Sequence, residues 1–109
     1  MSFLNDKFEE LERNVVQWAK DRQIIPNSNA QSQLLKTVSE LGELADALLK
    51  NDREGIIDGI GDVLVTLILC AKLHNPQIDM TYCLGEAYNT IKDRKGTLTP
   101  EGIFVKEPA

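Results

Sequence analysis

The sequence predicts an all-α, four-helix bundle-like fold with a short extended C-terminal tail. Apolar residues recur at steps of three and four through most of the chain, which is the period of an amphipathic helix. Polar or proline-containing breaks of about four to eight residues separate these segments and suit antiparallel neighbours. The chain has 109 residues, of which 42% are hydrophobic, so one globular domain is expected. We assign residues 1–96 to this helical domain and residues 97–109 to the tail.

The first predicted helix runs from about Leu4 to Arg22, and Pro26 with the polar residues after it ends the pattern. One face of this helix is apolar, and we expect it to pack inward. The residues of that face are Leu4, Phe8, Leu11, Val15 and Trp18.

The second predicted helix runs from about Asn29 to Lys50. Ser28 and Gln31 have the spacing of a capping box, in which each side chain binds a free backbone N–H of the first turn. We expect its apolar stripe to face the core. This stripe consists of Leu34, Val38, Leu41, Ala45 and Leu48.

The third and fourth predicted helices run from about Arg53 to Leu73 and from about Met80 to Lys95. Residues 63–71 are apolar on all sides, which indicates a buried segment. Asp79 is the expected N-cap of the last helix and Gly96 its stop. Ile103, Phe104 and Val105 are β-prone and predict the extended arm.

Charge and composition exclude several classes of function. The net charge of -5 disfavours binding to a nucleic-acid polymer. The longest apolar run, Val63 to Leu73, contains Lys72 and is far shorter than the roughly 20 residues of a membrane span. The acidic N-terminal residues do not resemble a signal peptide, so we expect a cytoplasmic protein. Cys70 and Cys83 lack zinc-site spacing and are expected to be reduced thiols.

Carboxylates stand where a helix would ordinarily place apolar residues. Glu40 and Glu43 lie on neighbouring ridges of the second helix, with Glu40 at the margin of the apolar stripe. A glutamate at a core margin costs free energy unless it is paired or binds a cation. Gly42 between them leaves room for a close approach.

The third helix repeats this feature. Glu54, Asp58 and Asp62 are four residues apart and form one negative stripe, which repels itself. Asp62 leads into the apolar half, and Gly59 and Gly61 beside it each cost about 1 kcal/mol relative to alanine. This pattern indicates a close approach or a metal, although such a stripe is more often a solvated face, above all at Glu54. Carboxylates without histidine or cysteine suit Mg²⁺, or Mn²⁺ as a substitute.

These motifs resemble the MazG-like nucleoside triphosphate pyrophosphohydrolases of the all-alpha NTP pyrophosphatase superfamily. The family pattern is ExxE on one helix and ExxD on the next, and the chain has Glu40-Leu41-Gly42-Glu43 followed by Gly61-Asp62-Val63-Leu64. The segment from Asn89 to Lys92 is similar to the family's Asn-x-x-Lys segment. The third acid of the family would fall at Gly59, so the resemblance transfers its metal-binding role to Asp58, with Glu54 as a possible assistant.

The resemblance implies cleavage of a ribo- or deoxyribonucleoside triphosphate to the monophosphate and pyrophosphate. Glu40, Glu43, Asp58 and Asp62 would hold magnesium, which activates a water for attack on the α-phosphorus. Glu40 or Glu43 would act as the catalytic base for that water. The resemblance also implies a homodimer or a homotetramer.

The residues expected to bind substrate each have an ordinary structural explanation. Lys92 and Arg94 form a phosphate clamp, or they are cations favoured at a helix C-terminus. Asn89 binds phosphate or a base edge, or it faces water. Trp18 stacks on a base, or it packs in the core as a single tryptophan commonly does.

Two other hypotheses compete with this enzyme. A di-iron bundle would need Glu-x-x-His, but Ala71 stands three residues before the only histidine, His74. A non-enzymatic helical interaction module would treat the acidic stripes as solvated faces and would gain no stability from magnesium.

Overall fold

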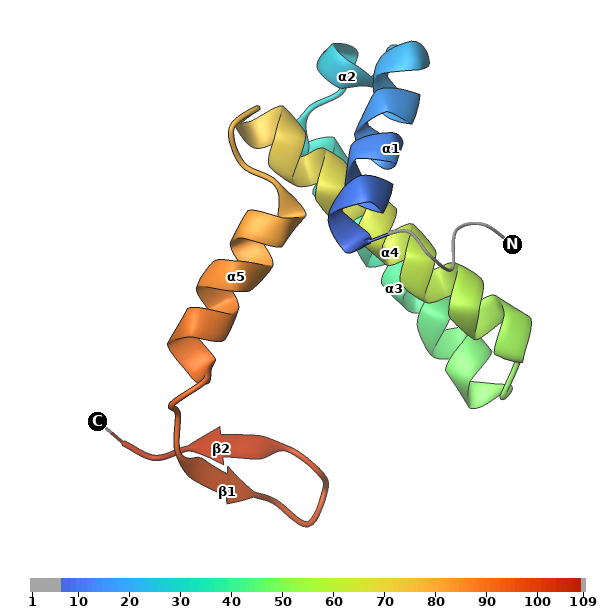
Figure 1. Ribbon diagram of the computed structural model, residues 1–109. Helices are drawn as coiled ribbons and strands as arrows, with labels where there is room; N and C mark the ends of the chain where they lie inside the picture. The colour runs from blue at the N-terminus through green and yellow to red at the C-terminus, as the bar shows by residue number, and fades with distance from the viewer. Residues whose placement is uncertain (1–6, 109) are drawn as a thin grey trace.

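The computed structural model describes residues 7–108, and the predicted all-α class with a short extended tail is confirmed (Figure 1). The chain folds into helices and one small hairpin. In chain order these are α1 Phe8–Asp21, α2 Ile24–Asn27, α3 Ala30–Leu49, α4 Arg53–His74, α5 Met80–Ile91, β1 Gly96–Leu98 and β2 Phe104–Lys106. The two strands pair antiparallel, with Thr97 opposite Val105.

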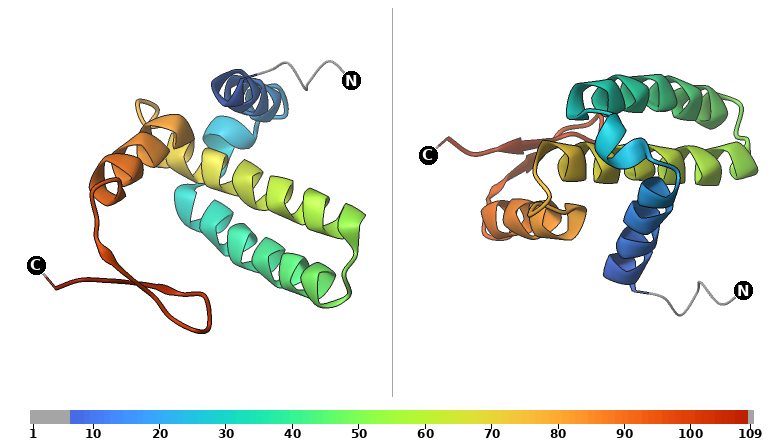
Figure 2. Two further views of the ribbon diagram at one scale, coloured as in Figure 1. Left: turned by 60° about the horizontal axis from the view of Figure 1, so that its bottom comes forward. Right: turned by 90° about the horizontal axis from the view of Figure 1, so that it is seen from above.

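The antiparallel pair of α3 and α4 is the scaffold of the molecule, and Figure 2 shows the two helices side by side along their length. The turn between them is short because Asn51 adopts φ 53°, a left-handed conformation that asparagine tolerates. The Oδ1 atom of Asp52 then accepts a hydrogen bond of 3.1 Å from the backbone N–H of Gly55 and caps α4.

Of the predicted helix boundaries, the N-cap of α5 is correct, whereas the N-cap of α3 and the end of α5 are wrong. Asp79 caps α5 as predicted, since its Oδ1 accepts from the Tyr82 N–H at 2.7 Å. The predicted capping box at Ser28 is wrong, because Asn29 accepts from the Ser32 N–H at 2.8 Å and takes the cap position. The helix α5 ends at Ile91 rather than near Lys95, and Gly96 begins β1 instead of ending a helix.

The predicted inward faces of α1 and α3 point outward in the single chain. On α1 the buried residues are Glu12, Val16 and Ala19. Of the predicted face, Val15 is half-buried, Phe8, Leu11 and Trp18 are exposed, and Leu4 lies outside the described residues. On α3 the buried residues are Thr37, Glu40 and Ala47. Leu34, Val38, Leu41 and Leu48 of the predicted stripe are exposed. Helix α3 packs the face that allows the closer approach to α4, because that face carries the smaller side chains Thr37 and Ala47.

Gly59 lies at a close contact between α3 and α4. A Cβ atom at this position would lie 3.1 to 3.3 Å from the Cδ1, Cβ and Cα atoms of Leu44. The expected close approach is therefore confirmed at Gly59, and the absence of a side chain there allows Leu44 to pack on the α4 backbone. Gly61 and Gly42 differ, because a Cβ atom at either would meet no described atom within 4 Å.

Helix α5 and the hairpin extend away from the scaffold (Figure 1). Leu84 and Tyr88 on α5 are each 61% exposed, and no residue of this helix is buried. The radius of gyration is 16.3 Å, compared with about 13 Å for a compact domain of this length. A single chain thus leaves a large apolar surface uncovered.

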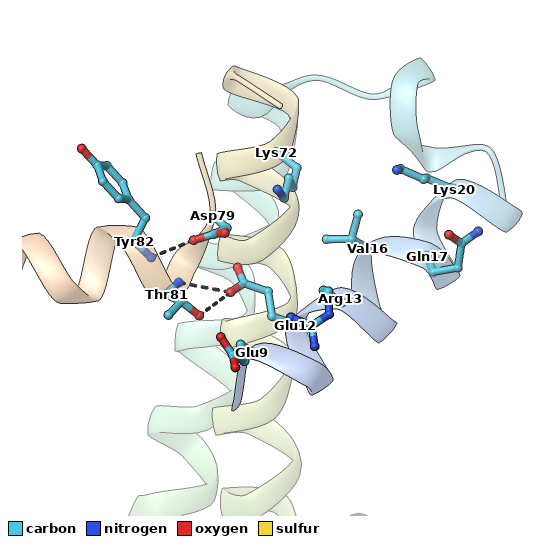
Figure 3. Close-up of a pocket in the computed structure, with 10 residues that line it drawn as sticks. All are labelled: Glu9, Glu12, Arg13, Val16, Gln17, Lys20, Lys72, Asp79, Thr81 and Tyr82. Atoms are coloured by element: carbon cyan, nitrogen blue, oxygen red, sulfur yellow. Dashed lines mark hydrogen bonds between the residues drawn. The ribbon is translucent and has the colours of Figure 1, made fainter. Parts of the chain in front are cut away.

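Glu12 attaches the beginning of α5 to α1 (Figure 3). Glu12 is only 4% exposed. Its carboxylate accepts hydrogen bonds from the backbone N–H of Met80, from the Thr81 N–H at 3.1 Å and from the Thr81 hydroxyl at 2.8 Å. A carboxylate at a helix N-terminus also interacts favourably with the helix dipole. A buried acid on α1 therefore fixes where α5 starts.

We predict that Gly61→Ala stabilises the protein and that Gly59→Ala does not. Alanine should stabilise an open helical site by about 0.5–1 kcal/mol relative to glycine, which is expected at Gly61. At Gly59 the gain should be cancelled or reversed, because Leu44 must move by a few tenths of an ångström. Urea unfolding followed by circular dichroism measures both variants, and equal stabilisation by the two would contradict the close approach.

We predict that Glu12→Ala lowers the free energy of unfolding by about 2–3 kcal/mol, since it removes a charged acceptor of several hydrogen bonds. It should also speed proteolytic cleavage between α4 and α5. Glu9→Ala is the matched control, because Glu9 is exposed on the same helix and makes no comparable bonds in the described part of the chain. Its effect should stay within about 0.5 kcal/mol, and a Glu12 variant as stable as this control would refute the attachment.

Candidate metal and nucleotide site

Three of the four predicted metal ligands line one cavity between α3 and α4. Glu43, Asp58 and Asp62 surround a space of about 400 Å³, together with Asp46 and Asp52. Glu43 comes from α3 and the two aspartates from α4, as the antiparallel pairing of these helices requires. We call this space the acidic cavity.

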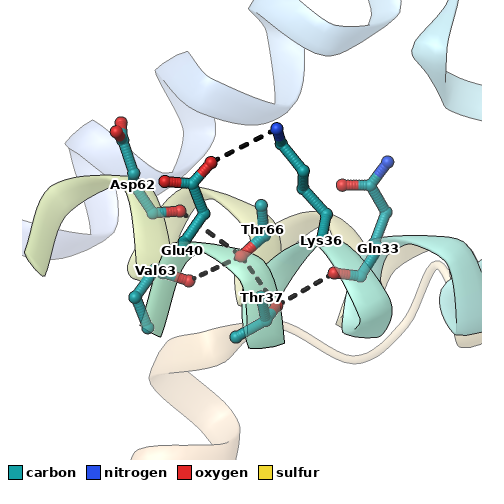
Figure 4. A network of polar contacts seen from close by, with 7 residues as sticks. All are labelled: Gln33, Lys36, Thr37, Glu40, Asp62, Val63 and Thr66. Carbon is teal, nitrogen blue, oxygen red and sulfur yellow. Dashed lines mark hydrogen bonds and ion pairs between the residues drawn. The ribbon is translucent and has the colours of Figure 1, made fainter. Parts of the chain in front are cut away.

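The fourth predicted ligand, Glu40, lies beside the acidic cavity and lines a second one. Glu40 is only 7% exposed, and its Oε1 atom forms an ion pair of 3.3 Å with the Nζ atom of Lys36. In Figure 4 the side chains of Lys36, Glu40 and Asp62 point to the same side of the helix pair. Asp62 lines both cavities, so the two lie on either side of this residue.

Buried hydroxyl groups hold the two helices together beneath Glu40. The Oγ1 atoms of Thr37 and Thr66 are 2.7 Å apart, and both threonines are buried (Figure 4). Thr66 also lies 3.0 Å from the carbonyl of Val63, and Thr37 lies 2.9 Å from the carbonyl of Gln33. Each hydroxyl group has one proton to donate and can also accept a hydrogen bond. Among the described residues, no buried side-chain nitrogen or oxygen atom is left without a hydrogen-bond partner.

The acids perturb one another electrostatically. A side-chain hydrogen bond with Glu40, followed by the negative charge of Glu40, raises the pKa of Glu43. Desolvation raises the pKa of Asp62, and the charges of Asp58 and Glu40 raise it further. Lys36 opposes both shifts without cancelling them. The site therefore holds more negative charge than its protein neighbours neutralise, which suits a hard divalent cation.

The acids surround a common region without closing on a single point. Among residues 7–108, no set of three or more Asp, Glu, His or Cys side chains is gathered closely enough to hold a metal ion as the side chains stand. Glu54, considered as an assistant, lines neither of the two cavities. Asp46 does line the acidic cavity, and its spacing of three from Glu43 was a signal available in the sequence.

The predicted substrate residues fall in different places. Trp18 is 42% exposed and lines the second cavity, with the Arg22 guanidinium 5.0 Å from its ring centroid. Arg94 lines a separate cavity beside the hairpin. Asn89 and Lys92 line neither cavity at the acids, because α5 leads away from them. Within one chain, Lys36 pairs with Glu40 and Lys50 lines the acidic cavity, and the sequence analysis identified neither lysine.

Family comparison agrees with this arrangement. The model of the MazG nucleotide pyrophosphohydrolase domain matches residues 28–98, which is more than half of the chain and includes both acid-bearing helices. The chain belongs to the MazG family. The nucleotide pyrophosphohydrolase family and the all-α fold expected from the sequence are therefore confirmed.

A curated relative and the solved structures add less about function. The chain is 39% identical over 64 residues to an uncharacterized 18.2 kDa protein in the rep-hol intergenic region of Haemophilus phage HP1. The match covers 59% of this chain and 39% of that protein, so the chain spans well under two thirds of its relative. No solved structure matches the chain.

In the described part of the chain, no helix is long and apolar enough to cross a membrane.

We predict that Asp62→Asn stabilises the metal-free protein at neutral pH and weakens its response to magnesium. Because the pKa of Asp62 is higher in the folded protein than in the unfolded chain, its ionised form favours unfolding above that pKa, and lowering the pH toward the pKa relieves this cost. The melting temperature without metal should rise by about 2–5 °C. Magnesium should raise the melting temperature of the wild type by several degrees and the melting temperature of Asp62→Asn by much less.

The matched control for this measurement is Glu54→Gln, which removes one exposed negative charge from the same helix outside both cavities. It should keep the full magnesium response. A response that persists in Asp62→Asn, or that disappears equally in the control, would place the cation elsewhere.

Proposed function

We propose that this MazG-family protein hydrolyses a ribo- or deoxyribonucleoside triphosphate to the nucleoside monophosphate and pyrophosphate in a magnesium-dependent reaction. The observation that carries this proposal is the uncompensated cluster of acids on α3 and α4, which lies inside the segment matched by the family. MazG-family enzymes are generally dependent on divalent metals. We expect the protein to act on free nucleotides in the cytoplasm, rather than on a nucleic-acid polymer or a membrane.

Four carboxylates are assigned to the cation in this proposal. Glu40, Glu43, Asp58 and Asp62 would hold Mg²⁺, for which Mn²⁺ can substitute. When bound, the metal neutralises the triphosphate and lowers the pKa of the water that attacks the α-phosphorus.

Glu43 is better suited than Glu40 to take the proton of that water. Glu40 is buried and paired with Lys36, whereas Glu43 is exposed at the acidic cavity and its pKa is raised. A base whose pKa lies closer to the working pH is more effective in general base catalysis. The role of Glu40 is then to hold the cation and to keep Lys36 at the site.

The phosphate-binding residues lead us to propose a homodimer or a homotetramer. Asn89, Lys92 and Arg94 are on α5 and just beyond it, and one chain directs them away from its own acids. Exposed apolar stripes on α3 and α5 give a second copy a surface to cover. A neighbouring α5 can supply these groups to the acids of this chain, while Trp18 stacks on the base.

The test is a panel of nucleoside triphosphates incubated with the protein and magnesium, with phosphate assayed in the presence and absence of inorganic pyrophosphatase. Phosphate should appear only when the pyrophosphatase is added, since pyrophosphate is the expected product. Phosphate without the added enzyme would show cleavage at the γ-phosphate and would overturn the proposal.

Variants connect this activity to the site. Glu43→Gln and Asp62→Asn should each lower kcat by about 100-fold or more, since each removes a group placed at the cation or the attacking water. Glu54→Gln should change kcat by less than about twofold, because Glu54 lines neither cavity. Equal activity of all three variants would remove the acids of α3 and α4 from the reaction.

The exposed apolar faces also favour a second candidate function, a helical interaction module that has no enzymatic activity. This alternative predicts no hydrolysis across the panel and no rise in melting temperature with magnesium. Both observations together would favour it over the enzyme.

A further inference from the structure

Two contacts between α3 and α4 stand at different levels of the helix pair. At one level Thr37 is hydrogen-bonded to Thr66, and at the other Leu44 packs on Gly59. The two levels are seven residues apart on each helix, which is two turns or about 10 Å of helix length. Asp62, which lines both cavities, lies between them on α4.

The hydroxyl contact lies directly beside the acids. Thr37 is one helical turn from Glu40 on α3, and Thr66 is one turn from Asp62 on α4. The Thr66 hydroxyl also lies 3.3 Å from the backbone carbonyl of Asp62, and Thr66 lines the second cavity together with both acids (Figure 4). A change in the spacing or rotation of the helices at this level therefore moves the two carboxylates relative to each other.

The contact between the hydroxyl groups does not depend on which of them donates. Their oxygen atoms are 2.7 Å apart, a distance that requires a proton between them. One threonine donates to the other, and the second donates to a carbonyl of its own helix. That carbonyl belongs to Gln33 for Thr37 and to Val63 for Thr66. Both arrangements of the protons are compatible with the same positions of the oxygen atoms.

Stability alone does not require hydroxyl groups at this level. Thr37 and Thr66 are only 4% and 6% exposed. Replacing both partners of a buried hydrogen bond by apolar groups of the same shape is nearly neutral or stabilising, so two valines would join the helices about as well. A hydrogen bond adds a fixed distance and direction, because a satisfied buried polar pair makes the packing rigid and specific.

We propose that Thr37 and Thr66 are positioning residues, which set the spacing of Glu40 and Asp62 and thereby the affinity of the site for a divalent cation. This inference rests on the proposed function, which assigns these acids to the cation. In the described part of the chain, the acids surround a common region without closing on one point, so the spacing of the helices decides whether they reach one ion. Groups that orient metal ligands contribute about 10- to 100-fold to metal affinity.

The experiment measures Mn²⁺ binding to the full chain without nucleotide, with free Mn²⁺ counted by electron paramagnetic resonance. The double variant Thr37→Val/Thr66→Val removes both hydroxyl groups, so its melting temperature should stay within about 5 °C of the wild type. Its Kd for Mn²⁺ should rise by about 10-fold or more. Thr37→Ser keeps the hydroxyl group, and its Kd should stay within about threefold of the wild type.

Thr90→Val is the matched control. The Thr90 hydroxyl donates to the carbonyl four residues earlier, as the Thr37 hydroxyl can, but Thr90 is on α5 and lines neither cavity at the acids. This variant should bind Mn²⁺ like the wild type. If the double variant fails to fold, Thr37→Val alone carries the test, because Thr66 keeps its hydrogen bond to the carbonyl of Val63.

The magnesium dependence of hydrolysis is a second measurement. The double variant should need about 10-fold more magnesium for half of its maximal rate, and its loss of rate should shrink as magnesium is raised. A purely structural defect would instead lower the melting temperature and the rate alike at every magnesium concentration.

The outcomes separate this inference from the proposed reaction. Weaker Mn²⁺ binding by the folded double variant, restored in Thr37→Ser, supports the inference even if no triphosphate is hydrolysed, in which case only the proposed function fails. The inference is overturned if the folded double variant binds Mn²⁺ like the wild type, if Thr90→Val weakens binding equally, or if the wild type binds no Mn²⁺. Hydrolysis of the nucleotide panel then decides the proposed function by itself.

Discussion

The close contact between α3 and α4 is the constraint on which the rest of the molecule depends. Leu44 packs on the backbone of Gly59, and elsewhere in the interface the hydroxyl group of Thr37 forms a hydrogen bond with that of Thr66. These two contacts fix the rotation of each helix about its axis, and that rotation turns Glu40 and Asp62 to the same side. The packing that stabilises the scaffold also desolvates Asp62 and brings the charges of Asp58 and Glu40 near it, and both effects raise the pKa of Asp62.

The same rotation explains why the single chain exposes so much apolar surface. With threonine, glutamate and alanine facing α4, the larger residues Leu34, Val38 and Leu41 of α3 must face outward. Helix α5 adds Leu84 and Tyr88 to this uncovered surface, because Glu12 attaches only its first turn to the rest of the chain. The polar contacts inside the α3–α4 interface and the apolar surface outside it are two results of the same packing, and this apolar surface is the one that the proposed assembly would cover.

Sequence patterns predicted what depends on local chemistry. They placed the long helices, the Asp79 cap and the acids on two consecutive helices, since each follows from spacing along a helix. They did not predict which face of α1 and α3 packs inward, because each buried face includes a glutamate that apolar periodicity does not mark. The direction of α5, and with it the separation of Lys92 from the acids, depends on hydrogen bonds between Glu12 and Thr81, which are 69 residues apart.

The contact at Gly59 also accounts for the one departure from the family pattern of acids. A side chain at this position would point at Leu44, whose Cα atom lies 3.3 Å from the place of the missing Cβ. An acid there would need a smaller residue on α3 or a wider spacing of the two helices. Asp58, one residue earlier, lines the acidic cavity without this conflict. The leucine on α3 and the glycine on α4 therefore form a matched pair, and their packing favours an acid at position 58 over one at position 59.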